Sequence, residues 1–174
     1  MTQVKLRSDR AAQPWGVELK STAFAPGGEI PGRYTCQGKD VSPPLAWSSV
    51  PANAKSLVLV VEDPDAPDPA APKETWVHWV LYDIPPQAGK LPEGAKHLPP
   101  GTHEGENDGG RTGYTGPCPP VGRHRYFHRL YALDAVLPDL GAAPSWAKVA
   151  AAMRGHVVAQ AELVGTYQKR GKKG

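Results

Sequence analysis

The sequence predicts a single domain built mainly from β-strands. Twenty prolines and nineteen glycines interrupt helices and favour short strands joined by structured loops. Residues 56–62 form a continuous apolar, β-branched run, and residues 157–167 alternate apolar and polar side chains, which are two patterns typical of strands. A chain of 174 residues that is 40% hydrophobic is long enough to bury one sizeable core.

Two short strands are expected before residue 50. Residues 17–24 alternate well enough for a strand, and the segment Ala25-Pro26-Gly27-Gly28 then turns the chain. Residues 42–47, Ser-Pro-Pro-Leu-Ala-Trp, predict a rigid start to a short segment at a sheet edge.

Two central strands follow. The run 56–62 has no polar face, as expected for a strand buried on both sides, and we expect it to end at Asp63-Pro64. Residues 76–84, Trp-Val-His-Trp-Val-Leu-Tyr-Asp-Ile, predict a second central strand that Pro85-Pro86 terminates.

A long loop separates these strands from the next one. Between Pro86 and Gly122 the sequence shows no regular period, and loops of this length in compact domains tend to be functional. Residues 123–134 return to strand character. One face of that strand carries His124, Tyr126, His128, Leu130 and Ala132.

The last part of the chain predicts one helix and one strand. Pro144-Ser145 opens the helix, and Gly155 is placed as its C-terminal stop. The apolar stripe of the helix consists of Trp146, Val149, Ala150 and Met153. The alternation over 157–167 predicts a final strand with one face on the core.

We expect an N-terminal extension over residues 1–16, one domain over 17–168 and a solvated basic tail over 169–174. The formal net charge is +3, and the tail alone carries four positive side chains. The domain itself is therefore not basic, and no nucleic-acid partner is expected. The sequence contains no apolar signal segment and no apolar run near 18 residues, so it predicts a cytoplasmic protein without an integral membrane segment.

Cys36 and Cys118 are the only cysteines, too few for a disulfide framework or a four-cysteine zinc site. Reduced thiols are expected in the cytosol. Cys118 lies beside prolines, and two interpretations stay open for it. It is either a nucleophile assisted by His124 or, as is commoner, a small buried hydrophobe.

Two motifs at strand ends carry polar side chains on a proline-stiffened backbone. The first is Asp63-Pro64-Asp65-Ala66-Pro67, and the second is the segment 116–126. Asp63-Pro64-Asp65 is either a turn that only ends a strand or a rigid support that aims Asp63 at an imidazole on a neighbouring strand. Side chains held in this way can converge on a small ligand.

The histidines differ in what their spacing indicates. His78 lies inside an apolar strand, where a lone histidine is more often a core residue than a ligand group. His124 and Tyr126 are two residues apart, which places their side chains about 6–7 Å apart on one face and suits two contacts to one small anion. His128 lies about 13 Å from His124 along the strand, so a structural role is expected.

Catalysis is not expected. Asp63, His78 and His124 can be imagined as a zinc site, but no close-spaced ligand pair supports one, and we predict neither a metal nor a cofactor. The sequence contains no G-x-S-x-G, no H-E-x-x-H and no phosphate-binding G-x-x-x-x-G-K-[ST] motif.

Five segments, in this order, resemble the phosphatidylethanolamine-binding proteins, also called Raf kinase inhibitor proteins, in their bacterial and archaeal branch. The similarity covers roughly residues 19–167. The segments are Tyr34-Thr-Cys-Gln-Gly38, Ser42-Pro-Pro-Leu-Ala-Trp47, Asp63-Pro-Asp-Ala-Pro67, His78-Trp79 and the stretch from Gly116 to Tyr126.

The resemblance implies a sandwich of two antiparallel sheets with a few short peripheral helices. It also implies a small surface pocket for phosphate, phosphoryl headgroups or similar anions. The residues implied for the pocket are Asp63, His78, His124 and Tyr126, with Gly116, Pro117 and Pro119 as its backbone wall. Asp65, Pro64 and Trp76 are expected to support it.

The function predicted on these grounds is reversible, non-catalytic binding of a small anionic or phosphorylated ligand, with modulation of a partner protein. Imidazole and phenol groups can donate hydrogen bonds to anionic oxygens, and Asp63 can hold a histidine in its donor tautomer. Inhibition of a kinase or protease is the alternative, and weak hydrolysis is the third. The resemblance alone suggests a homodimer.

Overall fold

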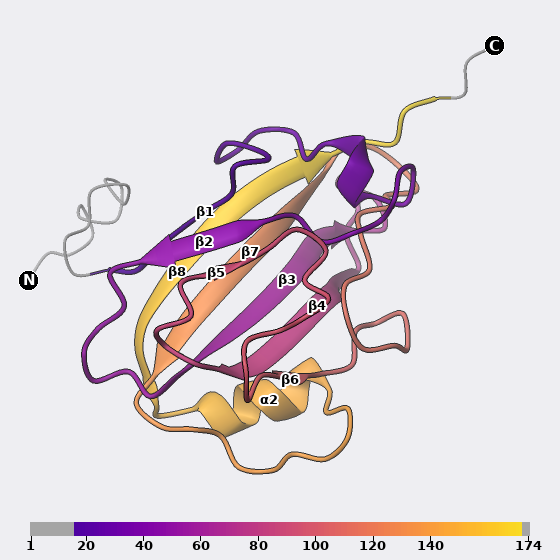
Figure 1. Ribbon diagram of the computed structural model, residues 1–174. Coiled ribbons are helices and arrows are strands. Elements are labelled where there is room, and N and C mark those ends of the chain that lie inside the picture. The colour runs from indigo at the N-terminus through magenta and orange to yellow at the C-terminus, as the bar shows by residue number, and fades with distance from the viewer. Residues whose placement is uncertain (1–15, 172–174) are drawn as a thin grey trace, which may run out of the picture.

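A computed structural model describes residues 16–171 and shows two antiparallel sheets packed face to face (Figure 1). In sheet order, the larger sheet contains β6 (His103–Glu104), β4 (Glu74–Ile84), β3 (Ser56–Ala66), β7 (His124–Leu133) and β8 (Val157–Tyr167). The smaller sheet contains β1 (Glu18–Lys20), β2 (Leu45–Ser48) and β5 (Lys90–Leu91). The short helices are η2 (Gly32–Tyr34) and α2 (Trp146–Met153). The predicted mainly β sandwich is confirmed, while almost all of the predicted N-terminal extension lies outside the described residues.

Strand β3 is buried on both faces, as its apolar run predicts. Leu57 and Leu59 belong to the main core between the two sheets, which also contains Trp47 of the smaller sheet. Val58 and Val60 point to the opposite face, where a second cluster includes side chains of α2. Each fully buried side chain of this kind contributes about 1.5–3 kcal/mol. The rigid centre of the domain is therefore the β4–β3–β7 ladder.

The smaller sheet differs from the sequence prediction at two places. The strand expected over 17–24 is limited to Glu18–Lys20, because the hydroxyl of Ser21 accepts a hydrogen bond from the Ala23 amide at 3.0 Å and bends the chain. The predicted edge segment, β2, is instead the middle strand of its sheet, with β1 on one side and β5 on the other.

Strand β3 does not end at Asp63-Pro64 as expected but continues to Ala66. Asp63 pairs with Trp76, and Ala66 pairs with Glu74. The chain therefore advances three residues along β3 where it advances only two along β4, which is a β-bulge. A bulge of this kind accommodates a proline, which has no amide hydrogen for the ladder. The acidic motif is thus held by the sheet itself.

The segment between β4 and β7 has more structure than the sequence pattern shows, since it contains β5 and β6. Asn107, which is buried, donates to the Gly113 carbonyl at 2.9 Å and accepts from the Gly109 amide at 2.8 Å. Asp108 accepts a hydrogen bond from the Val77 amide of β4 at 2.7 Å. These two side chains fix the loop against β4 and bring Thr115 and Gly116 to the end of the sheet.

Helix α2 and strand β8 agree with the predicted elements. Ser145 caps the helix by accepting from the Lys148 amide at 3.1 Å, and Gly155, at a φ of 83°, follows its end. Figure 1 shows α2 at one end of the larger sheet, away from the ends of β7 and β8 that lie near η2. No helix within residues 16–171 is long and apolar enough to cross a membrane.

The start of the predicted basic tail is tied to the domain. Arg170 donates its amide to Gln37 at 2.8 Å, and its carbonyl accepts from the Gln37 side chain at 3.0 Å. Its guanidinium also pairs with Glu29 at 3.0 Å. Residues 172–174 of the tail lie outside the described residues.

Candidate functional site

A pocket of about 330 Å³ lies where β3 ends and β4 and β7 begin. Because β3 is antiparallel to both neighbours, the end of one strand meets the beginnings of the other two. The pocket is lined by Asp63, Ala66, Pro67, Glu74, Trp76, His78, Thr115, Gly116, Cys118, Pro119, Pro120, His124 and Tyr126. The sequence-predicted residues Asp63, His78, Gly116, Pro119, His124 and Tyr126 are therefore brought together.

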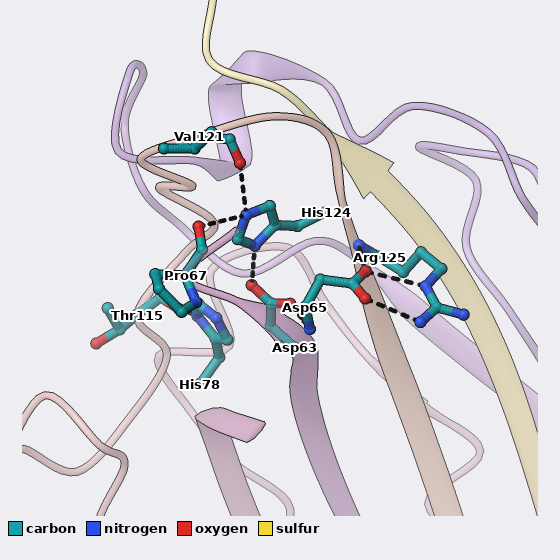
Figure 2. A network of polar contacts seen from close by, with 8 residues as sticks. All are labelled: Asp63, Asp65, Pro67, His78, Thr115, Val121, His124 and Arg125. Carbon is teal, nitrogen blue, oxygen red and sulfur yellow. Dashed lines mark hydrogen bonds and ion pairs between the residues drawn. The ribbon is translucent and has the colours of Figure 1, made fainter. Parts of the chain in front are cut away.

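His124 occupies the inner end of this pocket and is fully buried. Its Nδ1 lies 2.6 Å from the Asp63 carboxylate, and its Nε2 lies 2.9 Å from the Val121 carbonyl oxygen and 3.1 Å from that of Pro67 (Figure 2). The two carbonyl oxygens can only accept, so Nε2 carries a proton and donates it to the protein, while Nδ1 shares a proton with the Asp63 carboxyl group. His124 donates to the protein, which corrects the expectation that it donates directly to a ligand.

Asp63 and Asp65 play separate structural roles. Asp63 accepts the Asp65 amide at 2.7 Å through its second oxygen, which closes the turn at the bulge. Asp65 accepts three bonds from Arg125, two from the guanidinium and one from the amide, all at 2.9 Å. The hydrogen bond from the Arg125 side chain is the main cause that lowers the pKa of Asp65. Asp65 therefore braces the end of β3 against β7 (Figure 2).

His78 presents the nitrogen that is available to a ligand. Its Nδ1 lies 2.6 Å from the Thr115 carbonyl oxygen, which can only accept, so Nδ1 carries the proton in the neutral ring. Burial lowers the pKa of His78, while the Thr115 hydrogen bond and the charge of Asp63 partly oppose that shift. Neutral His78 thus offers Nε2 as an acceptor, and protonation converts the same atom into a charged donor.

The hydroxyl of Tyr126 is buried and has no partner at ordinary hydrogen-bond distance among the described residues, although the Asp63 carboxylate lies close enough to act on it. Burial is the main cause that raises the pKa of this phenol, and the nearby Asp63 carboxylate raises it further, so the hydroxyl keeps its proton. A buried polar atom without a partner is rare in native proteins. Its position among the pocket-lining residues makes it the strongest sign of a ligand site.

The charged side chains that line the pocket are acidic or imidazole groups. Asp63 is neutralised by His124, and Glu74 is exposed at the rim. Lysine and arginine are absent from the lining residues. Positive charge for an anion must therefore come from protonation of His78.

Gly116 forms the part of the wall that packs most tightly. Its amide donates to Asp40 at 2.9 Å, and a Cβ placed on it would overlap the Tyr34 carbonyl oxygen and lie 3.1 Å from the Cα of Thr35. Only glycine fits this approach of two loops.

We expect Gly116→Ala to lower the free energy of unfolding by about 1–3 kcal/mol, the range typical of overpacking. Gly32→Ala is a matched control on the facing loop, because a Cβ there would meet only the Tyr167 hydroxyl at 3.8 Å. Urea unfolding of both variants checks this. Equal stabilities for the two variants would contradict the tight packing at Gly116.

Cys36 and Cys118 form a disulfide with a Cα–Cα distance of 5.4 Å, which overturns the expectation of reduced thiols. The nucleophile interpretation of Cys118 falls with it, since a disulfide sulfur holds no thiolate. The sequence gives no sign of the pairing, because the two residues are 82 positions apart.

The other sequence-predicted residues have different places. Trp76 lines the pocket rather than only supporting it, and Pro64 and Pro117 do not line it. His128 is buried with Nδ1 at 3.2 Å from the Tyr126 and Leu163 carbonyl oxygens, and burial lowers its pKa to about 4, in keeping with a structural role.

Several pocket residues were missed from sequence. They are Ala66, Pro67, Glu74, Thr115, Cys118 and Pro120. Pro67 and Thr115 act through their carbonyl oxygens, which every residue possesses, so side-chain identity carries no signal for them.

A second hollow, of about 360 Å³, lies outside this pocket. It is flanked by Arg33, Lys39 and Lys96, but Glu93 lies within it and pairs with Arg33.

Within residues 16–171, no group of three histidine, cysteine, aspartate or glutamate side chains is arranged to hold a metal ion.

Comparison with known proteins identifies the family. A family model described as phosphatidylethanolamine-binding protein matches residues 20–168. A UPF0098 protein of Methanothermobacter thermautotrophicus is 51% identical over 156 residues, which cover 88% of this chain and 99% of the relative. A UPF0098 protein of Chlamydia trachomatis is 46% identical over 153 residues, with coverage of 88% and 99%.

Solved structures agree with the sequence relatives. The crystal structure of a phosphatidylethanolamine-binding protein homologue from Chlamydia trachomatis matches with a TM-score of 0.82 and 44% identity over 90% of this chain and 99% of that one. YbcL of E. coli matches with a TM-score of 0.80 and 30% identity over 88% of this chain and 99% of that one. The chain therefore belongs to the phosphatidylethanolamine-binding protein family, among its bacterial and archaeal members.

Proposed function

We propose that this protein binds a small anionic or phosphoryl-bearing ligand in the pocket at the end of β3, without chemical conversion. The observation that carries the proposal is the buried Tyr126 hydroxyl, which has no partner at ordinary hydrogen-bond distance among the described residues. The Tyr126 ring lies 5.3 Å from the ring of His78, centroid to centroid, so one small ligand can contact both. A phenol and a protonated imidazole are both hydrogen-bond donors suited to anionic oxygens.

The size and the family support the same class of ligand. A volume of about 330 Å³ is at the lower end of the range for small-molecule sites and suits a headgroup better than an acyl chain. The family is described by binding of phosphatidylethanolamine, a lipid with a phosphoryl headgroup. For this chain we propose only that it recognises a phosphoryl or similar anionic group, not that it binds the whole lipid.

Two structural features favour binding over catalysis. Nε2 of His124 donates to the Val121 and Pro67 carbonyl oxygens and Nδ1 is engaged by Asp63, so neither ring nitrogen is free to act as a general base toward a ligand. Cys118, the one cysteine among the pocket-lining residues, is held in a disulfide and offers no thiolate nucleophile. Inhibition of a kinase or protease stays a hypothesis, which pull-down from lysate with and without phosphate would test.

Removing the Tyr126 hydroxyl should weaken anion binding with little change in fold. We expect Tyr126→Phe to lower the affinity for sulfate by about 10- to 100-fold, the equivalent of one hydrogen bond to a charged group. Isothermal titration gives the affinity. Tyr131→Phe is the matched control, because Tyr131 lies on the same strand and does not line the pocket. The proposal fails if both variants bind sulfate as the unchanged protein does.

Sulfate affinity should also rise as the pH falls. A bound anion favours the protonated form of His78, so sulfate affinity rises as the pH falls into the range where histidine takes up a proton. Burial lowers the pKa of His78 in the ligand-free protein. The affinity should therefore continue to rise below about pH 6.5, the ordinary pKa of histidine. Four other titratable groups face His78. Asp63 and His124 are paired with each other, and Tyr126 stays protonated. Glu74 lies at the rim.

Titration of sulfate at several values between about pH 5.5 and about pH 8 checks this dependence, since sulfate keeps its charge over the range. His78→Gln should bind weakly and with a flat profile. Glu74→Gln should keep the rise seen in the unchanged protein. A rise that persists in His78→Gln would show that another group recognises the anion.

A further inference from the structure

The disulfide lies at the rim of the proposed ligand pocket and is open to solvent. Cys36 and Cys118 are both exposed, and Cys118 also lines the pocket. Cys36 follows η2, in a loop fixed by hydrogen bonds from the Thr35 hydroxyl to the Gly32 carbonyl at 2.8 Å and from the Asp40 amide to the Arg33 carbonyl at 3.0 Å. The disulfide thus joins the pocket wall to a rigid support.

The stretch of wall that the disulfide holds has few other attachments. On its N-terminal side, the Thr115 and Gly116 amides donate to His78 and Asp40, and the Pro117 carbonyl accepts from the Cys36 amide at 3.1 Å. On its C-terminal side, the Val121 carbonyl accepts from His124. Among the described residues, the backbone groups of 118–120 make no hydrogen bond. Cys118, Pro119 and Pro120 all line the pocket, and besides the packing of the buried Pro119 the disulfide is what attaches this outer wall to the rest of the described chain.

We propose that the Cys36–Cys118 disulfide is a thiol–disulfide exchange site through which low-molecular-weight thiols control the order of the pocket wall. The thiolate of such a thiol attacks one of the two sulfurs. The bond between Cys36 and Cys118 breaks, a mixed disulfide forms, and the other cysteine leaves as a thiolate that takes a proton from water. A second thiol then attacks the mixed disulfide, which releases the oxidised thiol dimer and leaves both cysteines reduced.

The expected effect on ligand affinity rests on the proposed function. Thiol–disulfide exchange at Cys36–Cys118 and the loosening of the pocket wall do not depend on it. Without its tether, the stretch 118–120 has to be ordered when a ligand binds, and that ordering weakens affinity. In the cytoplasm, which the sequence predicts as the location, such thiols are abundant and would favour the reduced form.

Exchange is tested first on the folded, full-length protein. The protein is incubated with reduced glutathione without denaturant, alkylated with iodoacetamide and analysed by mass spectrometry. We expect a transient glutathione adduct at Cys36 or Cys118, followed by alkylation of both cysteines. The proposal is overturned if neither residue reacts in the native protein while both react in urea.

Order of the wall is tested by ¹³C NMR relaxation of the Cα–Hα groups of residues 118–120, because prolines carry no amide hydrogen that could report on exchange. Oxidised protein, reduced protein and Cys36→Ser are compared, with the Cα–Hα groups of β3 residues 57–61 as a rigid reference in all three. Cys36→Ser frees Cys118 without changing any pocket-lining residue. We expect lower order parameters over 118–120 in the reduced protein and in the variant, and identical order parameters in all three forms would overturn the proposal.

Phosphate affinity then separates the proposal from the proposed function. It should fall several-fold on reduction, return on reoxidation and be insensitive to reductant in Cys36→Ser. Equal affinity in the oxidised and reduced forms would overturn control of binding by the disulfide. If neither form binds phosphate, the proposed function fails, and the glutathione and NMR results still decide whether thiols control the wall.

Discussion

Replacing His124 by alanine is expected to lower the free energy of unfolding by about 3–5 kcal/mol, the range found when one partner of a buried ion pair is removed. The substitution leaves the Asp63 carboxylate, which is 3% exposed, without the proton donor that lies 2.6 Å away. It also releases the carbonyl oxygens of Pro67 and Val121, which belong to two different loops. Urea unfolding followed by circular dichroism measures the loss.

A neighbouring ion pair provides the control. Arg125→Ala removes the guanidinium partner of Asp65, but the Arg125 side chain is 54% exposed and its backbone amide still donates to Asp65. Pairs with this exposure contribute about 0–1 kcal/mol. A loss in His124→Ala that is no larger than the loss in Arg125→Ala would contradict the buried ion pair.

A double variant isolates the pairing from other effects of the lost side chain. Asp63→Ala combined with His124→Ala leaves no unpaired charge, so it should be less destabilised than the sum of the two single variants. The difference between the sum and the double variant is the coupling between the two groups. Additive losses would show that the carboxylate is reached by water when His124 is absent.

The sequence was sufficient to predict features that depend on local pattern. The apolar run of β3 and the alternation along β7 and β8 predicted those strands, because side-chain periodicity follows from strand geometry. The antiparallel order then brings Asp63, His78 and Tyr126 to one end of the sheet. Local pattern therefore predicted the mainly β class and the separate strands, whereas the two-sheet sandwich and the set of pocket residues were implied by the resemblance to the family.

Features that depend on long-range placement of the backbone could not be predicted. The position of β2 in the middle of its sheet requires β5, which is only two residues long and has no pattern of its own. The role of His124 depends on the carbonyl groups of Pro67 and Val121, and a carbonyl group has no signature in sequence. The disulfide depends on the path of the long loop before β7.

Removing the Cys36–Cys118 disulfide should have the second largest effect on stability. A bond that joins residues 82 positions apart restricts the unfolded chain strongly, and the loop-entropy relation gives about 4.5 kcal/mol for a loop of this length. For a domain of this size that loss corresponds to about 9–18 °C in melting temperature. Cys36→Ser should therefore unfold well below the oxidised protein.

The native contacts around the bond indicate that this loss arises in the unfolded state. The Cys36 amide, the Gly116 amide and the Tyr114 hydroxyl each keep a hydrogen bond between the two loops when the sulfurs are separated, at 3.1, 2.9 and 2.8 Å respectively. Reduced protein and Cys36→Ser should then melt at the same temperature, and only the unchanged protein should respond to reductant. A melting temperature of Cys36→Ser close to that of the oxidised protein would show that the unfolded chain is already restricted without the bond, since the hydrogen bonds of Tyr114, Gly116 and Pro117 to the loop 34–40 remain in either case.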